Sequence, residues 1–155
     1  MSERVYWDYL HGGAHLGPFV KLWLNGPAAR WQIHTLFDTG ADYTCLSDQW
    51  LEILGLPAES CLPEELELAD GSTVTGLLGF VDAELDERRF RLPVVFSNVF
   101  EFDLIGRIGL LDQFQIIHDA REGWTTFDWH GAHGVPWAEM EFAAFEVRMR
   151  EVAPG

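Results

Sequence analysis

The sequence predicts an all-β domain with one or two short helices, and three observations lead to that prediction. Seven Trp and eleven Phe stand among 155 residues, and aromatic residues favour strands. Several short runs alternate between apolar and polar residues, which is the period of a half-buried strand. Turn residues separate these runs, whereas only two short segments show helical spacing.

The first predicted elements are two strands of a hairpin, followed by a helix. Residues 19–24 (Phe-Val-Lys-Leu-Trp-Leu) end at Asn-Gly-Pro, a strong turn signal, and residues 31–37 (Trp-Gln-Ile-His-Thr-Leu-Phe) then alternate with period two. A short helix is expected over residues 48–54, because Ser47 is a residue type that caps helices and Gly55 ends the apolar spacing.

Two further hairpins are expected in the middle of the chain. Residues 65–69 and 72–76 flank an Asp-Gly turn. Residues 80–85 and 90–96 flank a charged turn at residues 86–89. Pro93 would place its strand at a sheet edge or at a bulge, because proline cannot donate a ladder hydrogen bond.

The remaining elements are predicted by weaker patterns. Residues 108–114 have the spacing of one or two helical turns, and residues 115–119 and 124–129 are expected to pair as strands. The last twenty residues favour a strand only slightly over a helix. Without internal repeats or linkers, the chain divides into an N-terminal arm (1–17), a main domain (18–130) and a C-terminal extension (131–155).

The chain is strongly acidic, with 25 Asp and Glu against 10 Lys and Arg. This charge argues against nucleic acid or anionic lipid as a partner, because capturing phosphates needs a basic face. No apolar run approaches the ~20 residues that span a bilayer, and the N-terminus lacks the apolar segment of a signal peptide. We therefore expect a cytoplasmic protein with no membrane partner, in which Cys45 and Cys61 are buried free thiols.

One segment is a candidate for chemistry: Leu-Phe-Asp-Thr-Gly-Ala-Asp at residues 36–42. An apolar strand here delivers Asp38 directly into a Thr-Gly turn, and a carboxylate on such a loop suits acid–base catalysis. Gly40 would permit a backbone conformation that a Cβ atom forbids and let a substrate approach closely. The Thr39 hydroxyl would brace the turn. Taken alone, the same three residues are typical of an ordinary β-turn.

The segment resembles the active-site loop of the retroviral-type aspartic proteases, the retropepsins. The similarity extends to Leu-Ile-Gly-Arg at residues 104–107, which resembles that family's apolar-apolar-Gly-Arg element and is followed by a short helix. The hairpin over residues 65–79 lies where the family has its flap. The resemblance covers residues 19 to 127 and implies a closed acid-protease barrel. Two departures are a hairpin with less glycine and terminal arms without a counterpart in that family.

The resemblance also implies a role for each matching residue. Asp38 would be the catalytic carboxylate, Thr39 would interlock with Thr39 of the partner subunit, and Gly40 would contact the substrate through its backbone. Arg107 would pair with Asp42 and, with Gly106, support the substrate-binding loop. The other expected substrate-binding residues are Leu36, Ala41, Asp42 and Leu104 near the pocket and Asp70, Gly71 and Ser72 at the flap tip.

The implied function is that of an aspartic endopeptidase acting on a protein or peptide substrate as a homodimer. A single Asp-Thr-Gly copy can form the required pair of carboxylates only across a two-fold axis, and the two Asp38 side chains would then share one proton. No cofactor or metal is implied. Two alternatives stay open: a catalytically silent peptide-binding or scaffolding module, and a monomeric structural protein whose arms block the dimer face.

Two other features have modest interpretations. His11 and His15, or His130 and His133, have spacings that would suit a metal on a helix, but neither segment predicts a helix and no Cys accompanies them. We therefore expect no metal site. The acidic residues 64–67 are expected to be a solvated strand face.

Overall fold

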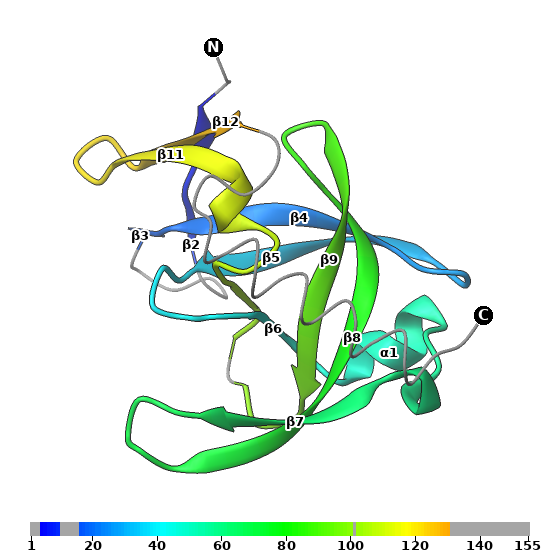
Figure 1. The fold of residues 1–155 in the computed structure, drawn as a ribbon. Helices are drawn as coiled ribbons and strands as arrows, with labels where there is room; N and C mark the ends of the chain where they lie inside the picture. Colours follow the sequence, from blue (N-terminus) through cyan, green and yellow to red (C-terminus); the bar gives the residue numbers. More distant parts are fainter. Residues whose placement is uncertain (1–3, 10–15, 101, 131–155) are drawn as a thin grey trace.

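The computed structural model describes residues 4–9, 16–100 and 102–130 (Figure 1). Most strands belong to a seven-stranded sheet in the order β4-β5-β10-β6-β9-β8-β7. These strands are β4 (Phe19–Asn25), β5 (Arg30–Phe37), β6 (Thr44–Ser47), β7 (Leu62–Glu67), β8 (Thr73–Leu85), β9 (Arg88–Ser97) and β10 (Leu104–Ile105). An additional pairing of β8 with β4 closes the first six strands into a ring. The predicted closed all-β barrel is confirmed.

The first hairpin and the helix follow the predicted pattern closely. β4 and β5 pair antiparallel from Phe19↔Leu36 to Asn25↔Arg30. The α-helix, α1 (Gln49–Leu54), ends at Gly55, which takes a left-handed conformation with φ 73°. The prediction that Ser47 caps this helix is wrong, because Ser47 is the last residue of β6 and Asp48 occupies the capping position. A 3₁₀ turn, η2 (Ala58–Ser60), leads from the helix into β7.

The two middle hairpins share one long strand. β8 runs without a break from Thr73 to Leu85 and pairs with β7 at one end and with β9 along most of its length. Figure 1 shows the β7–β8 hairpin extending from the barrel at the end away from β11 and β12. Asp86 and Glu87 both have positive φ angles, as the tight turn between β8 and β9 requires.

The prediction that Pro93 places its strand at a sheet edge or at a bulge is wrong. β9 is an interior strand of the sheet, with β8 on one side and β6 on the other. The parallel pairing with β6 begins only at Val94, however, whereas Pro93 lies opposite Phe80 of β8. The missing N–H of proline is tolerated because this part of β9 lies just before its second neighbour begins.

The end of the described chain forms a separate small sheet. A 3₁₀ turn, η3 (Leu111–Gln113), precedes β11 (Phe114–Asp119) and β12 (Trp124–Trp129), which pair as expected. β12 also pairs with β1 (Val5–Tyr6), and β2 (Asp8–Tyr9) pairs with β3 (Leu16–Gly17). The predicted C-terminal strand lies outside the described residues.

The main core fills the barrel and continues under the small sheet. Its fully buried side chains include Leu22, Leu24, Leu46, Phe96 and Phe127. Cys45 and Cys61 are both buried and free, as expected. Within the described part of the chain, no helix has the length and hydropathy to cross a membrane.

Candidate active site

Asp38 leaves the barrel at the point where β5 ends beside β10. These two strands run parallel, with Leu36 opposite Leu104 and Phe37 opposite Ile105. The backbone N–H of Asp38 donates to the carbonyl oxygen of Ile105 at 3.1 Å. Phe37 is buried next to Phe127, which fixes the end of β5 against the core. The apolar residues before Asp38 thus hold its backbone while its side chain stays half-buried.

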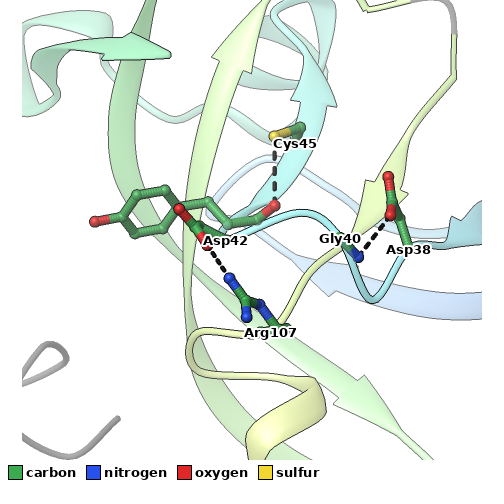
Figure 2. Close-up of polar contacts among 6 residues, drawn as sticks. Asp38, Gly40, Asp42, Cys45 and Arg107 are labelled. Atoms are coloured by element: carbon green, nitrogen blue, oxygen red, sulfur yellow. Dashed lines mark hydrogen bonds and ion pairs between the residues drawn. The ribbon is translucent and has the colours of Figure 1, made fainter. Parts of the chain in front are cut away.

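The residues after Asp38 form a tight turn that orients its carboxylate. The N–H of Gly40 donates to Asp38 Oδ1 at 2.9 Å, and the N–H of Ala41 donates to the Asp38 carbonyl oxygen at 3.3 Å (Figure 2). The expectation that Gly40 adopts a backbone conformation closed to other residues is wrong, because its φ is not positive. A Cβ atom on Gly40 would instead crowd Asp38 Oδ1 at 3.2 Å.

The residues after β10 clamp the other end of the loop. The N–H of Arg107 donates to Ala41 O at 3.0 Å, and that of Ile108 donates to Asp42 O at 2.8 Å. The Gly106 N–H donates to the buried Thr44 hydroxyl at 3.1 Å. Three consecutive backbone amides therefore hold residues 41–44, which explains how an apolar-apolar-Gly-Arg element far along the chain can shape the Asp38 loop.

Arg107 also forms an ion pair with Asp42, and this expected pairing is present. Figure 2 shows Asp38 at one end of the loop and Asp42 at the other, beside Arg107. The two side chains of the pair are 42% and 66% exposed. Because solvent screens such exposed pairs, this contact contributes little to overall stability. Its consequence is local: Asp42 is engaged with Arg107.

A cavity of about 770 Å³ lies between this loop and the β7–β8 hairpin. Of the expected substrate-binding and catalytic residues, Asp38, Gly40, Ala41, Asp42 and Leu104 line it. The residues that sequence reasoning missed are Tyr43, Cys45, Phe100, Glu64, Glu65, Leu66, Glu67, Leu68 and Ala69. The alternation of β7 signalled a strand but not which of its faces meets the loop, and nothing in the sequence around Phe100 marks it.

The remaining expected site residues lie around this cavity rather than in its lining. Leu36 is half-buried in β5, and Thr39 is exposed at the turn. Asp70, Gly71 and Ser72 form the turn of the hairpin beyond the lining segment. The Ser72 N–H donates to Asp70 Oδ1 at 2.9 Å. Hydrogen bonds from the Ser72 side chain and backbone lower the pKa of the Asp70 carboxyl below its usual value.

Cys45 lies in the cavity lining but is not suited to act as a nucleophile. Burial, together with the charges of Asp38 and Asp42, raises the pKa of its thiol to about 12. The Sγ atom donates a weak hydrogen bond to Tyr43 O at 3.4 Å. Since only the thiolate is strongly nucleophilic, the neutral thiol serves as an apolar part of the wall.

Asp103, just before β10, forms hydrogen bonds to residues of β5, β6 and α1 next to the site. Its carboxylate accepts hydrogen bonds from the Ser47 N–H at 2.9 Å and from Trp50 Nε1 at 3.2 Å. Its carbonyl oxygen accepts from the Leu36 N–H at 2.8 Å. Burial raises the pKa of the Asp103 carboxyl, although both hydrogen bonds act in the opposite direction. Asp103 thus joins the end of β5 to the end of β6.

Of the two acids on the Asp38 loop, one is engaged by a partner and the other opens onto the cavity. Asp42 is paired with Arg107, whereas the Asp38 carboxylate accepts a hydrogen bond from the Gly40 N–H and opens onto the cavity. No group of three or more His, Cys, Asp or Glu among the described residues is placed to hold a metal ion. His11, His15 and His133 lie outside those residues. The arrangement suits proton transfer by a carboxylate.

Comparison with known proteins gives one family. A family model described as "Aspartyl protease" matches residues 20–111, more than half of the chain. The matched region includes the Asp38 loop, the β7–β8 hairpin and the Gly106–Arg107 clamp. No curated protein sequence matches the chain significantly.

Proposed function

This chain belongs to the aspartyl protease family, and we propose that it is an aspartic endopeptidase that hydrolyses peptide bonds as a homodimer, with Asp38 of each subunit at a shared active site. The observation that carries the proposal is the placement of Asp38: a half-buried carboxylate, oriented by the Gly40 N–H, opening onto a cavity of about 770 Å³.

The chemistry needs two carboxylates around one water molecule. The chain contains one Asp-Thr-Gly sequence, so a second copy must supply the other carboxylate across a two-fold axis. Two carboxylates that flank one water molecule share one proton, because ionising both would place two like charges next to each other. The ionised Asp38 accepts a proton from water as the water attacks, and the protonated Asp38 of the partner subunit donates a hydrogen bond to the scissile carbonyl.

Exposure of the turn supports this assembly. Thr39 and Gly40 are both exposed, and within the described part of the chain no hydrogen bond engages the Thr39 side chain. An exposed turn of this kind, directly next to the catalytic acid, is available to meet its symmetry mate. We propose that the two Thr39 hydroxyls contact each other there and hold the two Asp38 side chains together.

The cavity wall suggests how a substrate is held. Among the described residues, β7 is the last strand of its sheet, and no described strand pairs with its outer edge. An extended peptide can pair with such an edge, while side-chain pockets supply specificity. In this proposal the β7–β8 hairpin acts as a flap over the substrate. The two free thiols of Cys45 and Cys61 suit a reducing compartment, which supports a cytoplasmic enzyme.

Subunit mixing tests both the catalyst and the dimer. The variant Asp38→Asn should lose peptidase activity by about 10²–10⁴-fold or more, the range for loss of an acid–base group, with unchanged circular dichroism. When wild-type protein is mixed and equilibrated with this variant, activity should fall with the square of the wild-type fraction, because only homodimers of wild type carry two carboxylates. Sedimentation should show the dimer at the concentrations assayed.

Other outcomes contradict the proposal in distinct ways. A linear fall of activity with wild-type fraction would mean that one subunit suffices for catalysis. A monomer at all concentrations would exclude the shared site. Full activity of Asp38→Asn would remove Asp38 from the mechanism. Absence of cleavage with retained peptide binding would support a silent binding module instead.

A further inference from the structure

The short strand β10 holds the backbone of Asp38. It consists of Leu104 and Ile105 alone. The carbonyl oxygen of Ile105 accepts the Asp38 N–H at 3.1 Å, and that of Asp103, just before the strand, accepts the Leu36 N–H at 2.8 Å. Any movement of β10 toward or away from β5 therefore displaces the backbone of Asp38.

The two ends of β10 are held in different ways. Backbone amides of residues 106–108 hold the end that leads into the clamp, whereas a side chain holds the end that begins at Asp103. Asp103 Oδ1 accepts the Ser47 N–H at 2.9 Å, and Oδ2 accepts the Trp50 Nε1–H at 3.2 Å. Ser47 is the last residue of β6 and Trp50 belongs to α1. One carboxylate thus attaches β10 to two other elements of the fold.

This attachment needs a carboxylate rather than a side chain of the same shape. An ionised carboxylate accepts hydrogen bonds at both of its oxygens, whereas an amide accepts at its oxygen and donates from its nitrogen. Asp103 is half-buried and both of its partners are N–H donors. An asparagine here would turn an N–H toward either the Ser47 amide or the Trp50 indole, and a buried donor that loses its acceptor is costly.

We propose that Asp103 is a positioning residue for the reaction at Asp38: its carboxylate fixes β10, and the Ile105 carbonyl then holds Asp38 where its side chain can act. The inference rests on the proposed function, because it concerns the same reaction. A displacement of about 1 Å at a reacting group can lower a rate by about 10²-fold. Since Asp103 lies outside the cavity lining, its loss should reduce kcat rather than weaken substrate binding.

The isosteric variant Asp103→Asn tests the role of the carboxylate. Its kcat should fall by at least about tenfold, as expected for a misplaced reacting group, while KM should stay within about twofold of the wild-type value. Both constants are measured at a temperature where urea titration shows every variant to be folded, so that a loss of stability alone leaves kcat unchanged. The matched control is Asp82→Asn, the same substitution at an exposed position of β8 outside the cavity, which should keep the wild-type kcat and KM.

A second substitution assigns the effect to the hydrogen bonds of Asp103. Trp50→Phe removes the indole N–H and should lower kcat by about threefold, because the carboxylate keeps only its bond to the Ser47 amide. In Asp103→Asn/Trp50→Phe, the asparagine oxygen can accept the Ser47 N–H, and its NH₂ group no longer faces an indole N–H. The double variant should therefore be more active than Asp103→Asn alone and lie within about twofold of Trp50→Phe, which is the non-additivity expected of directly bonded residues.

Three outcomes overturn the inference. A wild-type kcat in Asp103→Asn, together with a lower free energy of unfolding, would mean that Asp103 only stabilises the domain. A double variant no more active than Asp103→Asn would mean that the bond to Trp50 has no part in the effect. If Asp103→Asn does not fold, Trp50→Phe decides, and an unchanged kcat in that variant overturns the inference.

An NMR measurement separates this inference from the proposed function. The Gly40 N–H donates to Asp38 Oδ1, so its proton chemical shift reports where the Asp38 carboxylate lies. If the wild type cleaves no peptide, but Asp103→Asn moves this signal and the double variant returns it to its position in Trp50→Phe, the proposed function fails while the positioning of Asp38 by Asp103 stands. If peptides are cleaved and Asp103→Asn changes neither kcat nor the Gly40 signal, the function stands and the inference fails.

Discussion

Gly106 lies so close to Tyr43 that a Cβ atom added to it would come 2.3 Å from the Tyr43 carbonyl oxygen. The contact joins two backbone segments, the end of β10 and the start of β6, which are far apart in the sequence. Neither segment can move aside easily, because the Arg107 and Ile108 amides also bond to the Asp38 loop. The shape of the candidate site therefore depends on a glycine outside the Asp-Thr-Gly sequence.

Replacing Gly106 by alanine should destabilise the whole domain. A real Cβ atom cannot sit 2.3 Å from a carbonyl oxygen, so the loop must separate from β10. Overpacking of this kind costs typically about 1–3 kcal/mol. Urea denaturation followed by tryptophan fluorescence measures the effect. A free energy of unfolding within 0.5 kcal/mol of the wild-type value, roughly the effect of an ordinary surface substitution, would contradict the close contact.

Replacing Gly40 by alanine should affect peptidase activity more than the stability of the domain. Gly40 has no positive φ, and its added Cβ atom would meet only Asp38 Oδ1, at 3.2 Å. We expect a change in unfolding free energy of less than about 1 kcal/mol. If Asp38 has the proposed catalytic role, kcat/KM should fall by at least about tenfold, because the new methyl group crowds the Asp38 carboxylate. The same urea titration and a peptidase assay, run beside Gly106→Ala, separate the two effects. Unchanged activity would show that the turn tolerates displacement of Asp38.

The Arg107–Asp42 pair should be weakly coupled in stability. Both side chains are more than a third exposed, and exposed pairs contribute about 0.2–1 kcal/mol. A double-mutant cycle with Arg107→Met and Asp42→Asn measures the coupling from four urea titrations. A coupling above about 2 kcal/mol would show instead that the pair is a main stabilising contact.

Local patterns were sufficient to predict most of the strands, whereas the closed barrel was implied by the resemblance of residues 36–42 and 104–107 to the retropepsins. Period-two alternation and the Asn-Gly-Pro and Asp-Gly turns set β4, β5, β7 and β8, and these patterns act over a few residues. Pro93 shows where local reasoning fails. Its strand is interior in the sheet, and only the register with β6, which begins at Val94, makes the proline acceptable.

Local sequence patterns also fail to predict which residues line the cavity. Residues 64–67 have the composition of a solvated strand, yet they line the cavity together with Tyr43, Cys45 and Phe100. Which face of β7 meets the Asp38 loop depends on how the long strand β8 bends from the barrel, and this is a property of the tertiary structure. A tertiary contact likewise explains Gly106: its restriction comes from the Tyr43 backbone rather than from its own φ angle.

The Cys45 thiol should lower the free energy of unfolding of the domain as the pH rises above 9. Burial, together with the charges of Asp38 and Asp42, raises the pKa of its thiol from 9.0 to about 12. Below pH 9 the thiol is protonated in both the folded and the unfolded chain, so its contribution to stability is constant. Above pH 9 the unfolded chain ionises first, and the free energy of unfolding falls by up to about 1.4 kcal/mol for each pH unit. Urea titrations between pH 8 and pH 10.5 measure this slope.

The variant Cys45→Ala isolates the contribution of this thiol. Removing the sulfur leaves a small void and lowers stability at every pH, but the decline above pH 9 should become shallower, because one group that ionises more easily in the unfolded chain is gone. Burial also raises the pKa of Cys61, so Cys61→Ala is a parallel variant that should reduce the slope as well. Equal slopes in wild type and Cys45→Ala would mean that solvent reaches the thiol from the cavity and that the wall beside Asp38 is wetter than its burial implies.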